Sequence, residues 1–261
     1  MENNKNRLTK INWIGAYTLF YKECKRFLKV YQQTILAPAF TSLLFFFVIN
    51  TAIEGRTVND YDYMDFLAPG LIIMTMMQNA FANTSSSLLS SKIAGNIVDL
   101  LMPPFSINEI ILSYTLAALV RAILVGIFTF ILMSFFVEFK IVSLLNLFFF
   151  SIIGSLVLAL LGFLAGIWAE KFDNMSGVTN FIITPLTFLS GTFYSIEKLP
   201  TLFYNISLYN PFYYIIDGFR NALIDIGNQY LVYGITYLSM LSIILYVLCY
   251  YILKKGWRLK P

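Results

Sequence analysis

Long apolar stretches, separated by short polar segments, dominate the order of hydrophobic and polar positions along this chain. A helix needs about 20 apolar residues to cross roughly 30 Å of hydrocarbon, whereas a barrel strand needs about ten alternating ones. The stretches are continuous and show no period of two, so they predict helices rather than strands. Spans are expected at residues 35–53, 66–90, 110–137, 143–168, 176–193 and 229–253. We therefore predict an all-α polytopic membrane protein with six transmembrane helices.

The composition agrees, with 58% hydrophobic and 12% charged residues, far from the soluble average. Lysine and arginine favour the cytoplasmic side of a membrane, which indicates that both termini are cytoplasmic. The basic residues at the two ends are Lys5, Arg7, Lys10, Lys22, Lys25, Arg26 and Lys29, then Lys254, Lys255, Arg258 and Lys260. The acidic loop 54–65 suits the outer face, with Glu54, Asp60, Asp62 and Asp65 against Arg56. The net charge of +4 is therefore a topology signal, and no nucleic-acid partner is expected.

The residue inventory restricts the chemistry that the chain could perform. It has no histidine and only two cysteines, which excludes the usual zinc sites and Ser/His or Cys/His nucleophiles. No G-x-x-x-x-G-K-[ST] loop occurs, so any ATP and its magnesium ion are expected on another subunit, with no cofactor on this chain. An ATP-independent secondary transporter would be expected to carry several buried ionisable groups, and an intramembrane enzyme would need a catalytic constellation. Neither pattern occurs in the spans.

The N-terminal region 1–34 contains an amphipathic helical pattern. At 100° per residue its apolar positions share one face and its basic positions lie opposite. The apolar face holds Ile14, Tyr17, Tyr21, Cys24, Leu28 and Tyr31. This pattern is typical of a helix in the inner membrane interface, and equally of one packed on a cytoplasmic partner.

Two spans carry polar positions every three or four residues, which places them on one helix face. The members are Thr75, Asn79, Asn83, Ser86 and Ser90 in the second span, and Asn180, Thr184, Thr187 and Gly191 in the fifth. Such a face either lines a wet pathway or bonds to neighbouring helices. Arg121 is the ionisable residue well inside a span, about 15 Å from the start of its helix. It is either functional or satisfied by headgroups or backbone carbonyls.

Two connecting segments carry further patterns. In the cytoplasmic loop 92–109, Ile93, Ile97, Leu100 and Leu101 predict a short amphipathic helix, ended by Pro103 and Pro104. Such a helix suits docking into a partner's groove, although an ordinary interfacial loop has the same pattern. In the outer segment 194–225, Asn210 is a suitable N-cap and Pro211 a suitable first residue for a helix to about Leu223. Asp217 and Arg220 are predicted to pair across one turn of this helix.

These segments together resemble the membrane subunit of ABC-2 type ABC transporters. The resemblance covers essentially the whole chain and rests on "SKIAGNIVDLLMPPFSINEI", "LAALVRAILVGI", "TFLSGTFYSIEKLP" and "LYNPFYYIIDGFRNAL". It implies a permease of an ATP-driven exporter in the bacterial cytoplasmic (inner) membrane, working with an ABC ATP-binding subunit and a second copy of itself or a homologous permease. A sugar polymer, a lipid and an amphipathic drug all remain open as substrates.

The resemblance also implies roles for particular residues. The cytoplasmic loop would be the coupling helix that contacts the ATP-binding subunit, and the N-terminal helix would be a second contact. The implied coupling residues are Ile93, Gly95, Ile97, Asp99, Leu100, Leu101 and Pro103. The segment before the last span would form two short re-entrant helices on the outer side, with Gly191, Phe193, Tyr194, Pro200, Asn210, Pro211, Tyr214, Asp217 and Arg220.

Overall fold

The computed structural model describes residues 12–53, 57–58, 61–224 and 230–257. Side chains are described throughout these ranges except at Thr57, Val58, Tyr61, Leu100 and Leu101. Several charged residues used above for the topology therefore lie outside the described residues, namely Lys5, Arg7, Lys10, Glu54, Arg56, Asp60, Arg258 and Lys260.

The described chain is a bundle of helices with one small hairpin. The long elements are α1 (Trp13–Leu28), α2 (Ala37–Ala52), α3 (Tyr63–Ile93), α5 (Ile107–Met133), α6 (Leu144–Trp168) and α11 (Leu231–Lys255). The short ones are η2 (Gln32–Leu36), α4 (Ile97–Leu101), α7 (Phe172–Val178), η3 (Thr179–Ile183), α8 (Thr184–Phe188), η4 (Ile196–Lys198), α9 (Thr201–Tyr209) and α10 (Pro211–Ile224). Strands β1 (Thr57–Val58) and β2 (Tyr61–Asp62) pair antiparallel.

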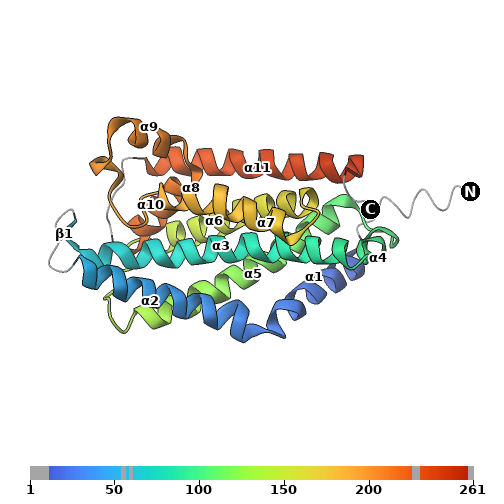
Figure 1. Ribbon diagram of the computed structural model, residues 1–261, viewed down its shortest axis with the longest axis horizontal. Coiled ribbons are helices and arrows are strands. Elements are labelled where there is room, and N and C mark those ends of the chain that lie inside the picture. Colours follow the sequence, from blue (N-terminus) through green and yellow to red (C-terminus); the bar gives the residue numbers. More distant parts are fainter. Residues whose placement is uncertain (1–11, 54–56, 59–60, 225–229, 258–261) are drawn as a thin grey trace, which may run out of the picture.

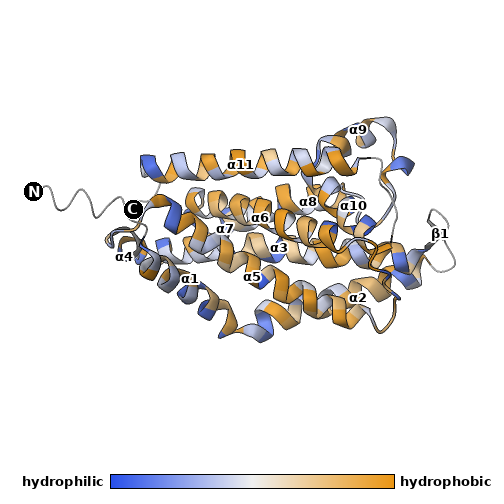
Figure 2. Cartoon of the chain, turned by 180° about the vertical axis from the view of Figure 1, so that it is seen from behind, coloured by the Kyte–Doolittle hydropathy of each residue, from blue (hydrophilic) through white to orange (hydrophobic). Residues whose placement is uncertain are grey.

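Figure 1 separates the two ends of the bundle. The first turn of α1, the short α4 and the last turn of α11 lie at one end, whereas β1, α9 and α10 lie toward the other. Hydrophilic positions gather toward these two ends and along α1, with apolar helix surface between them (Figure 2). The described chain therefore begins and ends on the same side of its apolar zone.

Four of the six expected spans meet the length and hydropathy of a membrane-crossing helix. They are Gln32–Ala52, Ile107–Met133, Leu144–Trp168 and Leu231–Lys255. Helix α3 is longer, at 31 residues, but less apolar, because it packs at the centre of the bundle against α6, α5, α10 and α2. Most of its side chains are buried by protein rather than exposed to lipid, so its sequence need not be uniformly hydrophobic.

The expected fifth span is not one regular helix. The chain runs from Phe172 to Phe188 through α7, a π-helical turn in η3, and α8. A π turn adds a residue to the helical repeat and changes which side chains share a face. It therefore shifts the register of a polar stripe that was read at 3.6 residues per turn.

In the fourth span, Gly162 and Gly166 have a small-xxx-small spacing, which predicts close helix contact, and α6 packs against α3 there. A Cβ at Gly162 would meet the Phe81 carbonyl oxygen and the Thr84 hydroxyl, and one at Gly166 would lie 2.9 Å from the Leu88 Cβ. The Thr84 hydroxyl also donates across the interface to the Ala159 carbonyl at 2.8 Å. The small residues thus permit the backbone contact that the spacing predicts.

We expect Gly162→Ala to destabilise the protein by about 1–3 kcal/mol, because backbone atoms of α3 cannot move aside cheaply. The measurement is the thermal unfolding midpoint of the purified protein in detergent. Gly177→Ala in α7 is the matched control, since a Cβ there meets nothing within 4 Å. It should leave the midpoint unchanged or raise it. Equal losses in the two variants would contradict the close contact.

Candidate functional site

The loop between α3 and α5 forms a compact projection at the end of the bundle where the described chain begins and ends. Gly95, at the turn out of α3, has a φ of +74°, a conformation that a side chain would disfavour. Ile97 is buried and anchors α4, whereas Val98, Asp99, Met102 and Pro103 are exposed. The side of α4 that carries Val98 therefore points away from the bundle, and Met102, 77% exposed, extends it.

The remaining implied docking residues are only partly described. Ile93, in the last turn of α3, is exposed, as docking would require. The side chains of Leu100 and Leu101 lie outside the described residues, so their part in the surface stays a prediction. The helix itself ends at Leu101, before Pro103 and Pro104, as the sequence predicts.

Glu109 fastens this loop to the beginning of α1. One carboxylate oxygen accepts from the Asn12 backbone N–H at 2.7 Å, and the other accepts from the Ser106 N–H at 2.9 Å. The Ser106 hydroxyl accepts from the Glu109 N–H, which completes a capping box at the start of α5. One buried carboxylate thus ties the two segments that the resemblance assigns to the ATP-binding partner.

Helix α1 presents its apolar face outward. Trp13, Ile14, Tyr17, Tyr21 and Leu28 are exposed, whereas Leu19, Glu23 and Phe27 face the bundle. The exposed apolar stripe is what a helix in a membrane interface needs, and the same stripe could pack on a partner.

Charged residues of α1 meet the polar stripe of α3. The Arg26 guanidinium donates to the Asn83 carbonyl at 2.8 Å, to the Asn83 Oδ1 at 3.0 Å and to the Ser86 hydroxyl at 3.5 Å. Glu23, only 1% exposed, pairs with Arg26 at 3.2 Å and accepts from the Ser87 hydroxyl at 2.6 Å. Asn83 and Ser86 therefore bond to a neighbouring helix, which favours the packing interpretation for this half of the stripe.

Arg121 of α5 meets the same stripe one turn away. Its Nη2 donates to the Asn79 Oδ1 at 2.8 Å, and its side chain is 8% exposed. Its partner among the described residues is thus the Asn79 side-chain amide. Asn79 also lines a cavity of about 310 Å³ between η2, α2 and α3, with Thr75 and Gln78. A pathway role for Asn79 remains a prediction.

The stripe of the fifth span is divided. Asn180 is exposed, Thr184 is half-buried, and Thr187 is buried with its hydroxyl bonded to the Ile183 carbonyl of its own helix. The π turn in η3 lies within this set and separates its members in exposure. The three side chains therefore differ in exposure, and their part in lining a pathway stays a prediction.

Arg220 of α10 holds the segment at the other end of the bundle together. Its Nε donates to the Phe66 carbonyl at 3.1 Å, and its Nη2 donates to the carbonyls of Gly191 at 2.9 Å and Thr192 at 3.3 Å. The guanidinium lies 3.7 Å from the centre of the Phe66 ring. Two residues singled out from the sequence, Gly191 and Arg220, are thus in direct contact.

The predicted pairing of Asp217 with Arg220 is wrong. No ion pair within 4.0 Å joins these two described side chains, whereas Glu23 and Arg26 lie 3.2 Å apart. Buried carbonyl oxygens of Phe66, Gly191 and Thr192 need donors, and the guanidinium supplies them while Asp217 stays half-buried. The helix start is correct: α10 begins at Pro211, and the Asn210 Oδ1 accepts from the Phe212 N–H at 3.1 Å.

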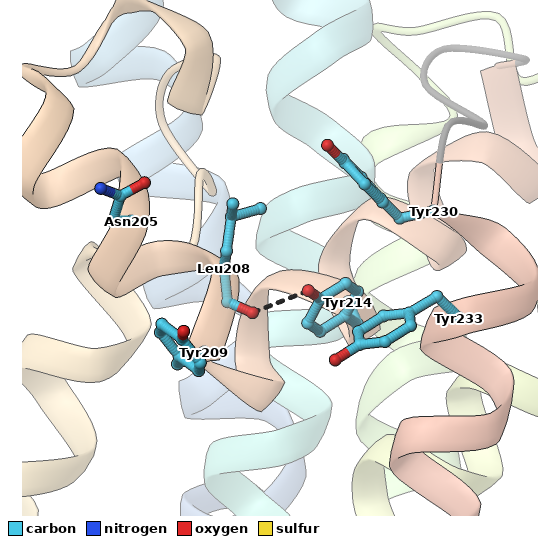
Figure 3. A pocket seen from close by; sticks show the side chains of 6 residues that line it. All are labelled: Asn205, Leu208, Tyr209, Tyr214, Tyr230 and Tyr233. Carbon is cyan, nitrogen blue, oxygen red and sulfur yellow. Dashed lines mark hydrogen bonds between the residues drawn. The ribbon is translucent and has the colours of Figure 1, made fainter.

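The rest of the segment from Gly191 to α10 packs around Arg220. The Phe193 carbonyl accepts from the Tyr63 hydroxyl, the Tyr194 hydroxyl donates to the Phe188 carbonyl, and Pro200 precedes α9. The Tyr214 hydroxyl donates to the Leu208 carbonyl at 2.7 Å, beside a cavity of about 540 Å³ (Figure 3). Asn205, Leu208, Tyr209, Tyr214, Tyr230 and Tyr233 line this cavity.

Sequence reasoning missed two buried acids, Glu23 and Glu109, which bond neighbouring segments at the α1 and α4 side of the bundle. Glu109 could have been found, because Ser106 and Glu109 have the S-x-x-E spacing of a capping box. Glu23 stands among basic residues, so its position in the sequence suggested a solvated face rather than a buried one. Its distinguishing signal is its place on the helix face that also carries Leu19 and Phe27.

Comparison with known proteins identifies the family. The ABC-2 type transporter family matches residues 15–224, which include α4, the polar stripe of α3 and the whole of α10. The chain belongs to the ABC-2 type transporter family. Inner membrane transport permease YadH of Escherichia coli K12 is 33% identical over 250 residues, covering 95% of this chain and 98% of that protein. The YadH proteins of Escherichia coli O157:H7 and Shigella flexneri match to the same extent.

Family membership confirms the coarse predictions made from the sequence. The chain is the membrane-embedded subunit of a transporter, and the family describes a transport permease rather than an enzyme. The relatives are named as inner membrane proteins, and four described helices suit membrane crossing. A multi-pass protein of the bacterial inner membrane is therefore the correct localisation.

Proposed function

We propose that the chain is the permease subunit of an ATP-driven exporter and that a separate ABC subunit binds ATP and magnesium. The observation that carries the proposal is the projecting α4 loop in a chain that belongs to the ABC-2 family. The sequence offers no phosphate-binding loop, which supports ATP binding on a partner rather than on this chain. Val98 and Met102 supply an exposed apolar surface of the kind that fits a partner's groove.

The proposal includes six membrane crossings with both termini in the cytoplasm. Helix α3, at 31 residues, is about 46 Å long and exceeds the roughly 30 Å of hydrocarbon. The broken helix from α7 to α8, extended by the segment to Phe193, would be the fifth crossing in chain order, before α11. The basic residues near α1 and at the end of α11 assign the end that carries α4 to the cytoplasm.

The segment 194–225 then belongs to the outer side. Helices α9 and α10 are short, consecutive and at the end of the bundle opposite α4 (Figure 1). Buried Arg220 bonds α10 to the start of α3, so the segment is packed against the bundle. We propose that α9 and α10 dip into the outer leaflet and return, closing the pathway on that side.

Two permease subunits, either identical or homologous, would form the pathway at their interface. Closure of the ATP-binding subunits would push on α4 and on α1, and the buried Glu109 would make these segments move together. The motion would reach α3, which continues directly into the α4 loop and carries the polar stripe. Substrate would leave toward the outer face.

A docking test follows from the exposed side of α4. Changing Val98 and Met102 together to glutamate should abolish co-purification of the ATP-binding subunit, because two charges would be buried without partners. The measurement is the ratio of the two subunits after mild-detergent purification. Lys198→Glu, an exposed position in η4, is the control and should keep the ratio. Unchanged association of the double variant would refute docking at α4.

A further inference from the structure

Two guanidinium groups from different helices bind successive turns of the α3 stripe. Arg121 of α5 donates to the Asn79 Oδ1, and Arg26 of α1 donates to the Asn83 Oδ1. Asn79 and Asn83 are four residues apart on one helix, which separates them by about 6 Å along its axis. The two positive charges therefore converge on one short stretch of α3.

The cluster formed by Arg26, Arg121, Asn79 and Asn83 has an excess of positive charge. Glu23 pairs with Arg26 at 3.2 Å, and it shares its Oε2 with the Ser87 hydroxyl. Arg121 has no acid within 4.0 Å among the described residues, although its side chain is almost fully buried. A buried charge without a counterion is costly, so such residues normally have a bound partner.

The cluster also has hydrogen-bond donors without acceptors. The Arg121 Nε and the Asn83 Nδ2 are both buried and lack a partner among the described atoms. The orientation of the Asn83 amide is fixed, because its oxygen must face the guanidinium of Arg26, which can only donate. Both orphan groups are therefore N–H donors, and only an acceptor can satisfy them.

A cavity reaches the cluster at one of its members, Asn79. Asn79 lines the cavity of about 310 Å³, together with Ser42, whose buried hydroxyl also has no partner. Gln33, Thr41, Thr75 and Gln78 add further polar side chains to this cavity. The Arg26 side chain is 35% exposed, so the cluster is not sealed.

We propose that a phosphate group binds between Arg121 and Arg26, against Asn79 and Asn83. A phosphate carries several strong acceptor oxygens that point in different directions, which suits donors arriving from α1, α3 and α5. The group belongs either to an anionic lipid headgroup or to a free phosphate compound that enters the cavity. This site does not depend on the proposed coupling to ATP, so the two ideas fail separately.

The test uses the full-length protein purified in a neutral detergent. Phosphatidylglycerol and inorganic phosphate are the two probes, and native mass spectrometry measures how much of each stays bound. Arg121→Gln should weaken binding roughly tenfold or more, since it removes the positive charge and several N–H donors of the guanidinium. Lys25→Gln is the matched control, because Lys25 is exposed on α1 and its loss changes the net charge equally.

A second variant keeps the test informative if Arg121→Gln folds poorly. Asn83→Asp retains an oxygen for Arg26 and replaces the orphan amide nitrogen with an acceptor. It supplies an internal anion, so it should abolish probe binding while the unfolding midpoint of the probe-free protein stays equal or rises. Its thermal unfolding in the same detergent reports on folding.

The outcomes separate the sources of the phosphate. Loss of phosphatidylglycerol binding in both variants, with no binding of inorganic phosphate, identifies a lipid headgroup site. Loss of inorganic phosphate binding in both variants identifies a site open to free phosphate compounds. If the wild type binds neither probe, or if both variants bind as Lys25→Gln does, the proposal is wrong.

Discussion

Replacing Arg220 by glutamine should destabilise the protein by about 3 kcal/mol or more and abolish transport. The guanidinium, 4% exposed, supplies donors to the carbonyls of Phe66, Gly191 and Thr192. Bonds from a charged donor contribute about 1.5–3 kcal/mol each, and their loss leaves buried acceptors unsatisfied. The measurement is the thermal unfolding midpoint of the purified protein, followed by transport at a temperature where the variant remains folded.

Asp217→Asn is the matched control for this prediction. If carbonyl anchoring holds the segment, removing the Asp217 charge should change the midpoint little, because no direct ion pair within 4.0 Å joins it to Arg220. A loss in Asp217→Asn as large as that in Arg220→Gln would mean that an ion pair, and not the carbonyl bonds, stabilises α10.

Replacing Glu109 by alanine should release the start of α1 from the α5 cap. The buried carboxylate accepts from two backbone N–H groups, at Asn12 and Ser106, and both would lose a charged acceptor. A cost of about 3 kcal/mol corresponds to roughly a hundredfold faster exchange of those two amides. Amide hydrogen exchange followed by mass spectrometry measures this directly.

Glu109→Gln and Asn108→Ala calibrate the result. The glutamine keeps one accepting oxygen, so it should lose about half of that free energy, which corresponds to roughly tenfold faster exchange. Asn108 is exposed and accepts from the Tyr246 hydroxyl at 3.0 Å, so its removal should leave the Asn12 amide protected. Unchanged exchange at Asn12 in Glu109→Ala would show that the carboxylate does not join the two segments.

Local signals in the sequence predicted local structure well. The start of α10 at Pro211 follows from an N-cap and a proline, both adjacent to the helix they begin. The end of α4 before Pro103 and the close packing at Gly162 also depend on short-range or steric rules. The four most apolar spans could be found because lipid demands uniform hydrophobicity.

Contacts between distant segments could not be predicted in the same way. Arg220 has an acidic neighbour three residues away, yet its acceptors come from Phe66 and Gly191, which only the folded bundle brings together. The partner of Arg121 is Asn79, 42 residues away along the chain, and it was identified only as a member of a polar stripe. The π turn of η3 has no clear sequence signal, so the residue that it adds to the helical repeat near Thr187 could not be predicted.

The central claim, that this permease is powered by a separate ATP-binding subunit, is tested most directly by purification from its native membrane. The tagged protein is solubilised in mild detergent, the proteins that come with it are identified, and ATP hydrolysis is measured after reconstitution into vesicles. We expect an ATP-binding subunit in equal amount and ATP hydrolysis that depends on the permease. Recovery of the permease alone, without ATP hydrolysis, would contradict the account.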